Sequence, residues 1–228
     1  MSDYQAVFEV EGSAAMFARP DTGGTPTSYP GPTWSAAKGL FESIAFLADG
    51  AAWICPIKVE ICKRVGESGG QIRFQRYTTN YGGPLRKSDL FGKGANMQFF
   101  ATILSDVCYR LHGTIINSRW KNRNNPGHHL QDLFGRRLRQ GRCFRTPCLG
   151  WSEFTCSYWG PVRNGITEVD TELSLEIPSM LLGVWNSPTC GQYEPEFSQN
   201  VKVVEGVLKY DVPEAWLSRD KQEVITGA

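Results

Sequence analysis

The sequence lacks paired cysteine motifs and long apolar runs, and both absences exclude classes of protein. Its seven cysteines are an odd number, and none of them are spaced as C-x-x-C. A zinc site or a disulfide framework is therefore not expected, and nothing predicts a metal or another cofactor. No window approaches the roughly 18 consecutive apolar residues of a membrane-spanning helix, and the N-terminal MSDYQAVFEV has no basic start. The sequence predicts a soluble, cytoplasmic protein with reduced thiols and no membrane partner.

A large net charge is also absent, since 24 basic side chains stand against 23 acidic ones and the total is +1. That total by itself predicts no polyanionic partner, but the distribution of charge matters more. The segment 119–145 contains one acid, Asp132, among the cations Arg119, Lys121, Arg123, Arg136, Arg137, Arg139, Arg142 and Arg145. Arginine instead of lysine over so short a span favours phosphate recognition, with a solvated helix face as the alternative interpretation.

A helix is predicted over residues 30–46, with the sequence PGPTWSAAKGLFESIAF. Thr33 can cap its start, and apolar residues recur behind it at three- and four-residue spacing. Gly39 inside this helix costs about 1 kcal/mol relative to alanine, so we expect another group to approach it closely. Trp34 is a weaker candidate for stacking on a base, with a core position as the alternative.

Strands are predicted before and after this helix. The apolar alternation of the chain predicts them at 4–10, where Gly12 interrupts the pattern, and at 51–65, 71–81, 98–116 and 143–154. Pro56 places an edge or bulge in the second strand, and the third is a hairpin partner with cations on one face. A second helix is predicted from Pro126 to Gln140, ending at Gly141. With the hairpin strand counted as an extension, the order strand, helix, strand, strand, helix, strand is the α+β, ferredoxin-like βαββαβ arrangement that RNA-recognition modules share.

The texture of the sequence changes near residue 157. Residues 1–157 are predicted to form the ferredoxin-like domain with its β-hairpin extension. Residues 158–228 contain short β-like pieces at 173–177 and 201–208, followed by a polar tail. We expect them to form a small, β-rich C-terminal region.

Several short motifs, taken in order, resemble one protein family. They are Phe17-Ala18-Arg19-Pro20, Ser28-Tyr29, Pro32-Thr33, Ser35-Ala36-Ala37-Lys38-Gly39 and Glu42-Ser43-Ile44. Together they resemble the N-terminal signature of the CRISPR-associated Cas five family of the RAMP superfamily. Features comparable to those of its subtype I-C branch occur at Pro56-Ile57, Gly127-His128-His129 and Cys148-Leu149-Gly150.

The resemblance implies a subunit of the Cascade surveillance complex. Such a subunit holds the 5′ handle of CRISPR RNA, contacts the backbone subunit, Cas seven, and the large subunit, and meets target DNA through the complex. In subtype I-C it also implies a metal-independent endoribonuclease that cuts precursor CRISPR RNA through attack of a ribose 2′-hydroxyl on the neighbouring phosphate. This chemistry needs a base for the 2′ proton, an acid for the leaving 5′ oxygen and a cation for the added negative charge.

The resemblance also places the catalytic group. The family's lysine–histidine pair falls on His128 and His129, and its aromatic hydroxyl falls on Ala45, with Tyr77 or Tyr81 as the expected substitutes. Imidazoles titrate near neutral pH and a helix start attracts phosphate, which suits proton transfer in RNA cleavage. The alternative interpretation is a pair of exposed polar residues at a loop–helix junction.

The cations expected to bind RNA are Lys38, Arg73, Arg76, Arg136, Arg137, Arg139, Arg142 and Arg145. Three alternatives stay open for this basic surface: a catalytically silent RNA-capping scaffold, an interface with an acidic partner subunit, and binding of double-stranded DNA. Incubation with repeat RNA in excess chelator separates the enzyme from the scaffold. Binding that survives high salt only for RNA would count against DNA.

Overall fold

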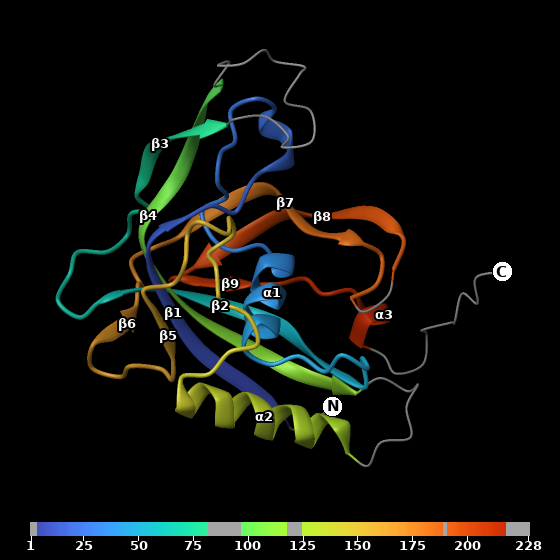
Figure 1. Cartoon of the computed structure of the whole chain (residues 1–228). Coiled ribbons are helices and arrows are strands. Elements are labelled where there is room, and N and C mark those ends of the chain that lie inside the picture. Colours follow the sequence, from blue (N-terminus) through green and yellow to red (C-terminus); the bar gives the residue numbers. More distant parts are fainter. Residues whose placement is uncertain (1–3, 82–96, 118–124, 189–190, 218–228) are drawn as a thin grey trace.

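The computed structural model describes residues 4–81, 97–117, 125–188 and 191–217 (Figure 1). It is a mixed α/β fold with one large antiparallel sheet and few helices. The strands are β1 (Gln5–Ala15), β2 (Ala52–Arg64), β3 (Phe74–Tyr81), β4 (Met97–Asn117), β5 (Tyr158–Gly160), β6 (Thr167–Val169), β7 (Leu175–Trp185), β8 (Tyr193–Val204) and β9 (Val207–Lys209). The helices are α1 (Trp34–Ile44), α2 (Pro126–Gln140) and the short α3 (Glu214–Leu217), with a 3₁₀ turn at Pro20–Thr22.

The long strand β4 lies in the middle of the sheet and pairs with three other strands. The strand order is β5-β1-β4-β2-β9-β8-β7, with antiparallel pairing between neighbours. The expected hairpin strand β3 pairs with the first part of β4 rather than with β2, from Phe74↔Leu104 to Tyr81↔Met97. The irregularity expected at Pro56 is confirmed, because the register between β2 and β4 shifts there. Pairing with β3, β1 and β2 along its length explains why β4 is so long.

Both long helices cover the same face of the sheet (Figure 1). The ring of Phe8 on β1 lies 5.0 Å from that of Phe41 on α1 and 5.7 Å from that of Phe134 on α2, between ring centres. The expected cap of α1 is present, because Thr33 Oγ1 accepts a hydrogen bond from the backbone of Ala36 at 3.2 Å. The predicted boundaries of α2 agree with the structure, so periodicity and caps located both helices.

Three expectations near α1 and β1 are not met. A Cβ added to Gly39 would find no atom of the described residues within 4 Å, so none of them approaches this glycine closely. Trp34 is 3% exposed and packs against Trp53 and Trp216, so it belongs to the core and is no base platform. Strand β1 continues through Gly12, where the side chain of Leu149 occupies the space that a Cβ would need.

The prediction of a strand over 143–154 is wrong. Backbone N–H groups that a strand would direct to the sheet are used elsewhere: those of Phe144 and Arg145 bond the carbonyl of Ser43 at 2.8 and 2.9 Å. A tight turn follows, with the N–H of Leu149 bonded to the carbonyl of Phe154 at 2.7 Å. The strand that follows α2 is instead β5, which pairs with β1. A segment whose N–H groups close the end of a helix cannot extend the sheet.

Strands from both sides of residue 157 join the same sheet. Strand β5 pairs with β1, and β9 pairs with β2 and β8. The division at residue 157 stays a prediction. None of the described helices is long and apolar enough to cross a membrane. The six described cysteines, Cys55, Cys62, Cys108, Cys143, Cys148 and Cys156, carry no disulfide.

Candidate functional site

The start of α2 is fixed by an asparagine cap. Asn125 adopts a left-handed backbone with φ of 48° and ψ of 62°, which asparagine tolerates better than most residues. Its Oδ1 accepts a hydrogen bond from the backbone N–H of His128 at 3.4 Å, and its Nδ2 donates to the hydroxyl of Tyr4 at 3.0 Å. Pro126 opens the helix, where the missing N–H has no cost. One side chain therefore ties the first strand to the helix start.

Asn125→Ala is expected to lower the free energy of unfolding by about 1 kcal/mol, because the cap bond is lost and alanine disfavours a positive φ. Asn125→Gly is the matched control, since glycine accepts the left-handed backbone and costs only a few tenths of a kcal/mol at a cap. Urea unfolding of the three proteins measures the difference. Equal losses in both variants would contradict the backbone part of this explanation.

The two histidines at this helix start are exposed. His128 Nδ1 lies 3.5 Å from Asp132 Oδ2, one turn further along the helix. The ring of His128 also meets the edge of the Tyr4 ring, with 5.9 Å between centres. His129 anchors the helix through its backbone N–H, which bonds the carbonyl of Asn125 at 3.2 Å. An imidazole oriented by a carboxylate and open to solvent is suited to accept or donate a proton.

Sequence reasoning missed Tyr4, which brings an aromatic hydroxyl to the histidine pair. Ala45, which stands at the family's aromatic-hydroxyl position, is 2% exposed at the end of α1. Tyr77 pairs with Ala101 on β4, whereas Gln5, the neighbour of Tyr4, pairs with Thr114. About 40 Å of strand separates the two pairs. Tyr81 pairs with Met97, which lies further along β4 from Thr114 than Ala101 does. No local pattern in the sequence links Tyr4 to the histidines.

The exposed face of α2 carries both the histidines and two of the expected arginines. At about 100° per residue, Arg136 and Arg139 fall within the same arc of about 100° as His128, His129 and Asp132, and all five are exposed. Arg136 lies about 10 Å, and Arg139 about 15 Å, beyond His129 along the helix axis. Arg142 and Arg145 follow directly and are exposed as well. We call this surface the α2 basic face: His128, His129, Arg136, Arg139, Arg142 and Arg145.

The remaining expected cations lie elsewhere or are already bound. Arg137 donates from Nη1 to the carbonyl of Ile44 at 2.8 Å and thereby ties α2 to α1. Lys38 forms an ion pair with Glu42, and its side chain is 14% exposed. Arg73 lies 3.6 Å from Asp106 beside the far part of β4, and Arg76 is exposed on β3. Arg119, Lys121 and Arg123 lie outside the described residues.

Comparison with known proteins identifies the chain. A family model described as CRISPR-associated protein (Cas_Cas5) matches residues 6–214. The chain belongs to the Cas5 family. This is the family that the ordered N-terminal motifs resemble, so the resemblance is confirmed.

Two bacterial relatives share one name with each other. A protein named CRISPR pre-crRNA endoribonuclease Cas5d from Thermus thermophilus is 29% identical over 173 residues, which cover 76% of this chain and 70% of the relative. A protein of that name from Mannheimia succiniciproducens is 30% identical over 158 residues, covering 64% and 68%. A crystal structure of a CRISPR-associated protein, 17% identical, superposes with a TM-score of 0.66 over 93% of this chain and 94% of that one. A Streptococcus mutans protein of uncharacterized function gives 0.65 at the same identity and coverage. Both solved structures share the fold.

The Cas5 signature residues of this chain build the fold more than the site. Ser28 Oγ accepts from the backbone N–H of Phe17 at 3.0 Å and donates to the carbonyl of Tyr29 at 2.8 Å. The hydroxyl of Tyr29 accepts from the backbone of Leu181 at 3.1 Å, which joins this loop to β7. All three signature residues are buried. Because these residues pack the core, the motifs identify the family but do not locate its catalytic residues.

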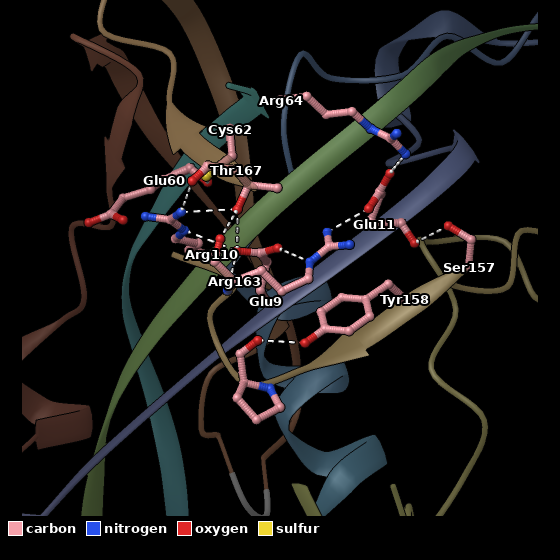
Figure 2. A network of polar contacts seen from close by, with 11 residues as sticks. Glu9, Glu11, Glu60, Cys62, Arg64, Arg110, Ser157, Tyr158, Arg163 and Thr167 are labelled. Carbon is pink, nitrogen blue, oxygen red and sulfur yellow. Dashed lines mark hydrogen bonds and ion pairs between the residues drawn. The ribbon is translucent and has the colours of Figure 1, made fainter. Parts of the chain in front are cut away.

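The sheet face away from the helices carries a polar cluster centred on Glu9 of β1 (Figure 2). The Glu9 residue is 0% exposed. Its carboxylate accepts hydrogen bonds from Thr167 Oγ1 at 2.8 Å, Arg163 Nε at 2.7 Å and Arg110 Nε at 3.1 Å. The guanidinium of Arg163 in turn lies 3.8 Å from the centre of the Tyr158 ring. The cluster thus joins β1, β4, β5 and β6.

Burial raises the pKa of Glu9, but the hydrogen bonds from Thr167, Arg163 and Arg110 outweigh it and hold the pKa below its ordinary value of 4.5. The carboxylate is therefore ionised and paired at neutral pH. Because the carboxylate of Glu9 is already bonded to Thr167, Arg163 and Arg110, we interpret this cluster as stabilising the fold. Among the described residues, no group of three or more His, Cys, Asp or Glu side chains is arranged to hold a metal ion.

Proposed function

We propose that this Cas5 protein is a type I Cascade subunit that binds the 5′ handle of CRISPR RNA on the α2 basic face and cuts the precursor transcript there. One observation carries the proposal: the two histidines share one exposed stripe of α2 with Arg136 and Arg139. An RNA backbone held by Arg136 and Arg139 is therefore within reach of His129. The name of the Thermus and Mannheimia relatives, pre-crRNA endoribonuclease, supports the cleavage step.

The cleavage step uses groups of this chain alone. One imidazole of the pair takes the proton of a ribose 2′-hydroxyl, and the 2′ oxygen attacks the adjacent phosphorus. The bond from phosphorus to the 5′ oxygen breaks, the leaving oxygen receives a proton from the other imidazole, which acts as the acid, and a cyclic phosphate remains. We assign proton transfer to His129, with His128 beside it, held by Asp132. The positive N-terminal end of α2 stabilises the added negative charge.

Several finer assignments accompany this function. The order β5-β1-β4-β2 with helices α1 and α2 on one face supports a ferredoxin-like core. The partners proposed from the family are CRISPR RNA, the backbone subunit Cas seven, the large subunit and, through the complex, target DNA. The free described cysteines support a cytoplasmic location.

One experiment separates the endoribonuclease from the alternative, a non-catalytic scaffold subunit. Full-length protein is incubated with a repeat-derived RNA in excess chelator, and the RNA is resolved on denaturing and native gels. A single cut supports the enzyme. Intact RNA that is shifted on the native gel supports a non-catalytic subunit that caps the CRISPR RNA, and RNA that is neither cut nor shifted contradicts both.

Arg136→Gln combined with Arg139→Gln is expected to weaken binding of a repeat RNA and to lower the slope of log affinity against log salt by about 1.4, since each phosphate contact on a single strand contributes about 0.7. Fluorescence anisotropy between about 50 and 200 mM salt measures both quantities. Lys202→Gln combined with Lys209→Gln is the matched control, because it removes the same charge from β8 and β9. An equal loss in the control would contradict an interface on α2.

A further inference from the structure

Two exposed phenylalanines form a contacting pair beside the α2 basic face. Phe46, just after α1, is 41% exposed, and Phe144, just after α2, is 55% exposed. Their ring centres lie 5.8 Å apart with 42° between the ring planes. Single exposed apolar side chains are ordinary on protein surfaces. Two large rings that contact each other and remain open to solvent form an apolar surface that a partner can cover.

The backbone beneath this pair is firmly held. The N–H of Phe144 bonds the carbonyls of Ser43 and Ile44 at 2.8 and 3.2 Å, and the N–H of Arg145 bonds Ser43 at 2.9 Å. Arg137 adds a bond from its guanidinium to the carbonyl of Ile44 at 2.8 Å. These contacts satisfy carbonyls at the end of α1 that the helix leaves open. The Phe144 ring is thus presented on a backbone ordered before any ligand arrives, which lowers the entropic cost of binding.

The charges next to the pair favour a nucleic acid over a protein. Arg142 and Arg145 lie two residues before and one residue after Phe144, and both are exposed. A second exposed aromatic pair, Trp185 and Tyr193 at the end of the β7–β8 hairpin, has 6.1 Å between ring centres. Its chain neighbours include the acids Glu194 and Glu196, which repel phosphate. Aromatic rings among cations are the usual platform for single-stranded nucleic acids.

We infer that Phe144, supported by Phe46, stacks one unpaired base of the bound RNA while Arg142 and Arg145 hold the flanking phosphates. The inference rests on the proposed function and adds a base-stacking position to it. Rings tilted by 42° at 5.8 Å leave no space for a base between them, so the base stacks on the open face of Phe144. Stacking of this kind is tolerant of base identity, because every base has an aromatic face.

The test uses repeat-derived RNA oligonucleotides, each with one base replaced by an abasic ribose, and full-length protein carrying His129→Ala to keep the RNA intact. Phe144→Ala is expected to lower affinity for the unmodified RNA by about 5- to 150-fold. In the Phe144 parent, one abasic position is expected to cause a similar loss. In Phe144→Ala the same abasic position is expected to cause no further loss of affinity, because the abasic site and the substitution remove the same contact. Phe144→Trp is expected to restore both the affinity and the sensitivity.

Trp185→Ala is the matched control and is expected to bind every oligonucleotide as the parent does. Urea unfolding of Phe144→Ala checks that the variant is folded and keeps the stability of the parent. Parental affinity with unchanged abasic penalties in Phe144→Ala would overturn the inference, and a defect confined to assembly with a protein subunit would do the same. In both cases the salt slope of the Arg136 and Arg139 variant still supports RNA binding on α2, whereas a parent that ignores repeat RNA removes the proposed function as well.

Discussion

His129→Ala is expected to lower the rate of repeat-RNA cleavage by about 10²- to 10⁴-fold, the range for loss of a general acid or base, with little change in RNA affinity. The imidazole is exposed and at the N-terminal end of α2, so its removal costs no core packing. The arginines that bind the RNA remain in place. Single-turnover cleavage in excess chelator measures the rate, and anisotropy measures the affinity.

The neighbouring residues give graded controls for this result. His128→Lys recreates the lysine–histidine pair that the family resemblance implies and is expected to keep cleavage. Asp132→Asn removes the negative charge beside His128 Nδ1 and reports whether this carboxylate, by orienting the imidazole, contributes to the cleavage rate. Tyr4→Phe removes the hydroxyl that Asn125 contacts and reports whether this oxygen takes part. Cleavage by His129→Ala at the parental rate would exclude His129 as the proton-transfer group.

Glu9→Gln is expected to destabilise the protein by about 3–5 kcal/mol, the usual cost of removing one partner of a buried ion pair. The amide carries no charge, so Arg110, whose side chain is only 13% exposed, loses the carboxylate of Glu9, while Arg163 keeps its ion pair with Glu11. Urea unfolding measures the loss. Glu196→Gln is the control on an exposed position of β8, where we expect a change within about 0.5 kcal/mol. Equal effects at both positions would contradict a special role for the buried cluster.

The same cluster predicts a dependence of stability on pH. Burial raises the pKa of Glu9, but its hydrogen bonds lower the pKa by more than burial raises it. The folded pKa therefore lies below the unfolded value of about 4.5. A carboxyl with a lowered folded pKa stabilises the fold fully above the unfolded pKa and loses that contribution as the pH falls through the folded value. The difference in unfolding free energy between parent and Glu9→Gln is therefore expected to be constant near neutral pH and to narrow below about pH 4.5. A difference that stays constant down to pH 3 would contradict this account.

Local patterns in the sequence predicted the elements whose signals are contained within a few turns of chain. Apolar spacing and a capping threonine located α1, and Pro126 with Gly141 bounded α2. Of the three arginines of this helix that were expected to bind RNA, the structure exposes Arg136 and Arg139 and bonds Arg137 to the end of α1. The ordered motifs from Phe17 to Ile44 were enough to identify the family.

The sequence by itself determined the helices, most of the long strands and the family, because period, caps and motif order are local properties of the chain. Only the tertiary structure decided that β5, and not 143–154, completes the pairing with β1. It also decided that Tyr4 meets His128 and that Phe46 meets Phe144. Each of these contacts joins residues far apart in the chain, and each depends on where the helices lie on the sheet. No short-range spacing records that placement, since burial across the whole fold selects it.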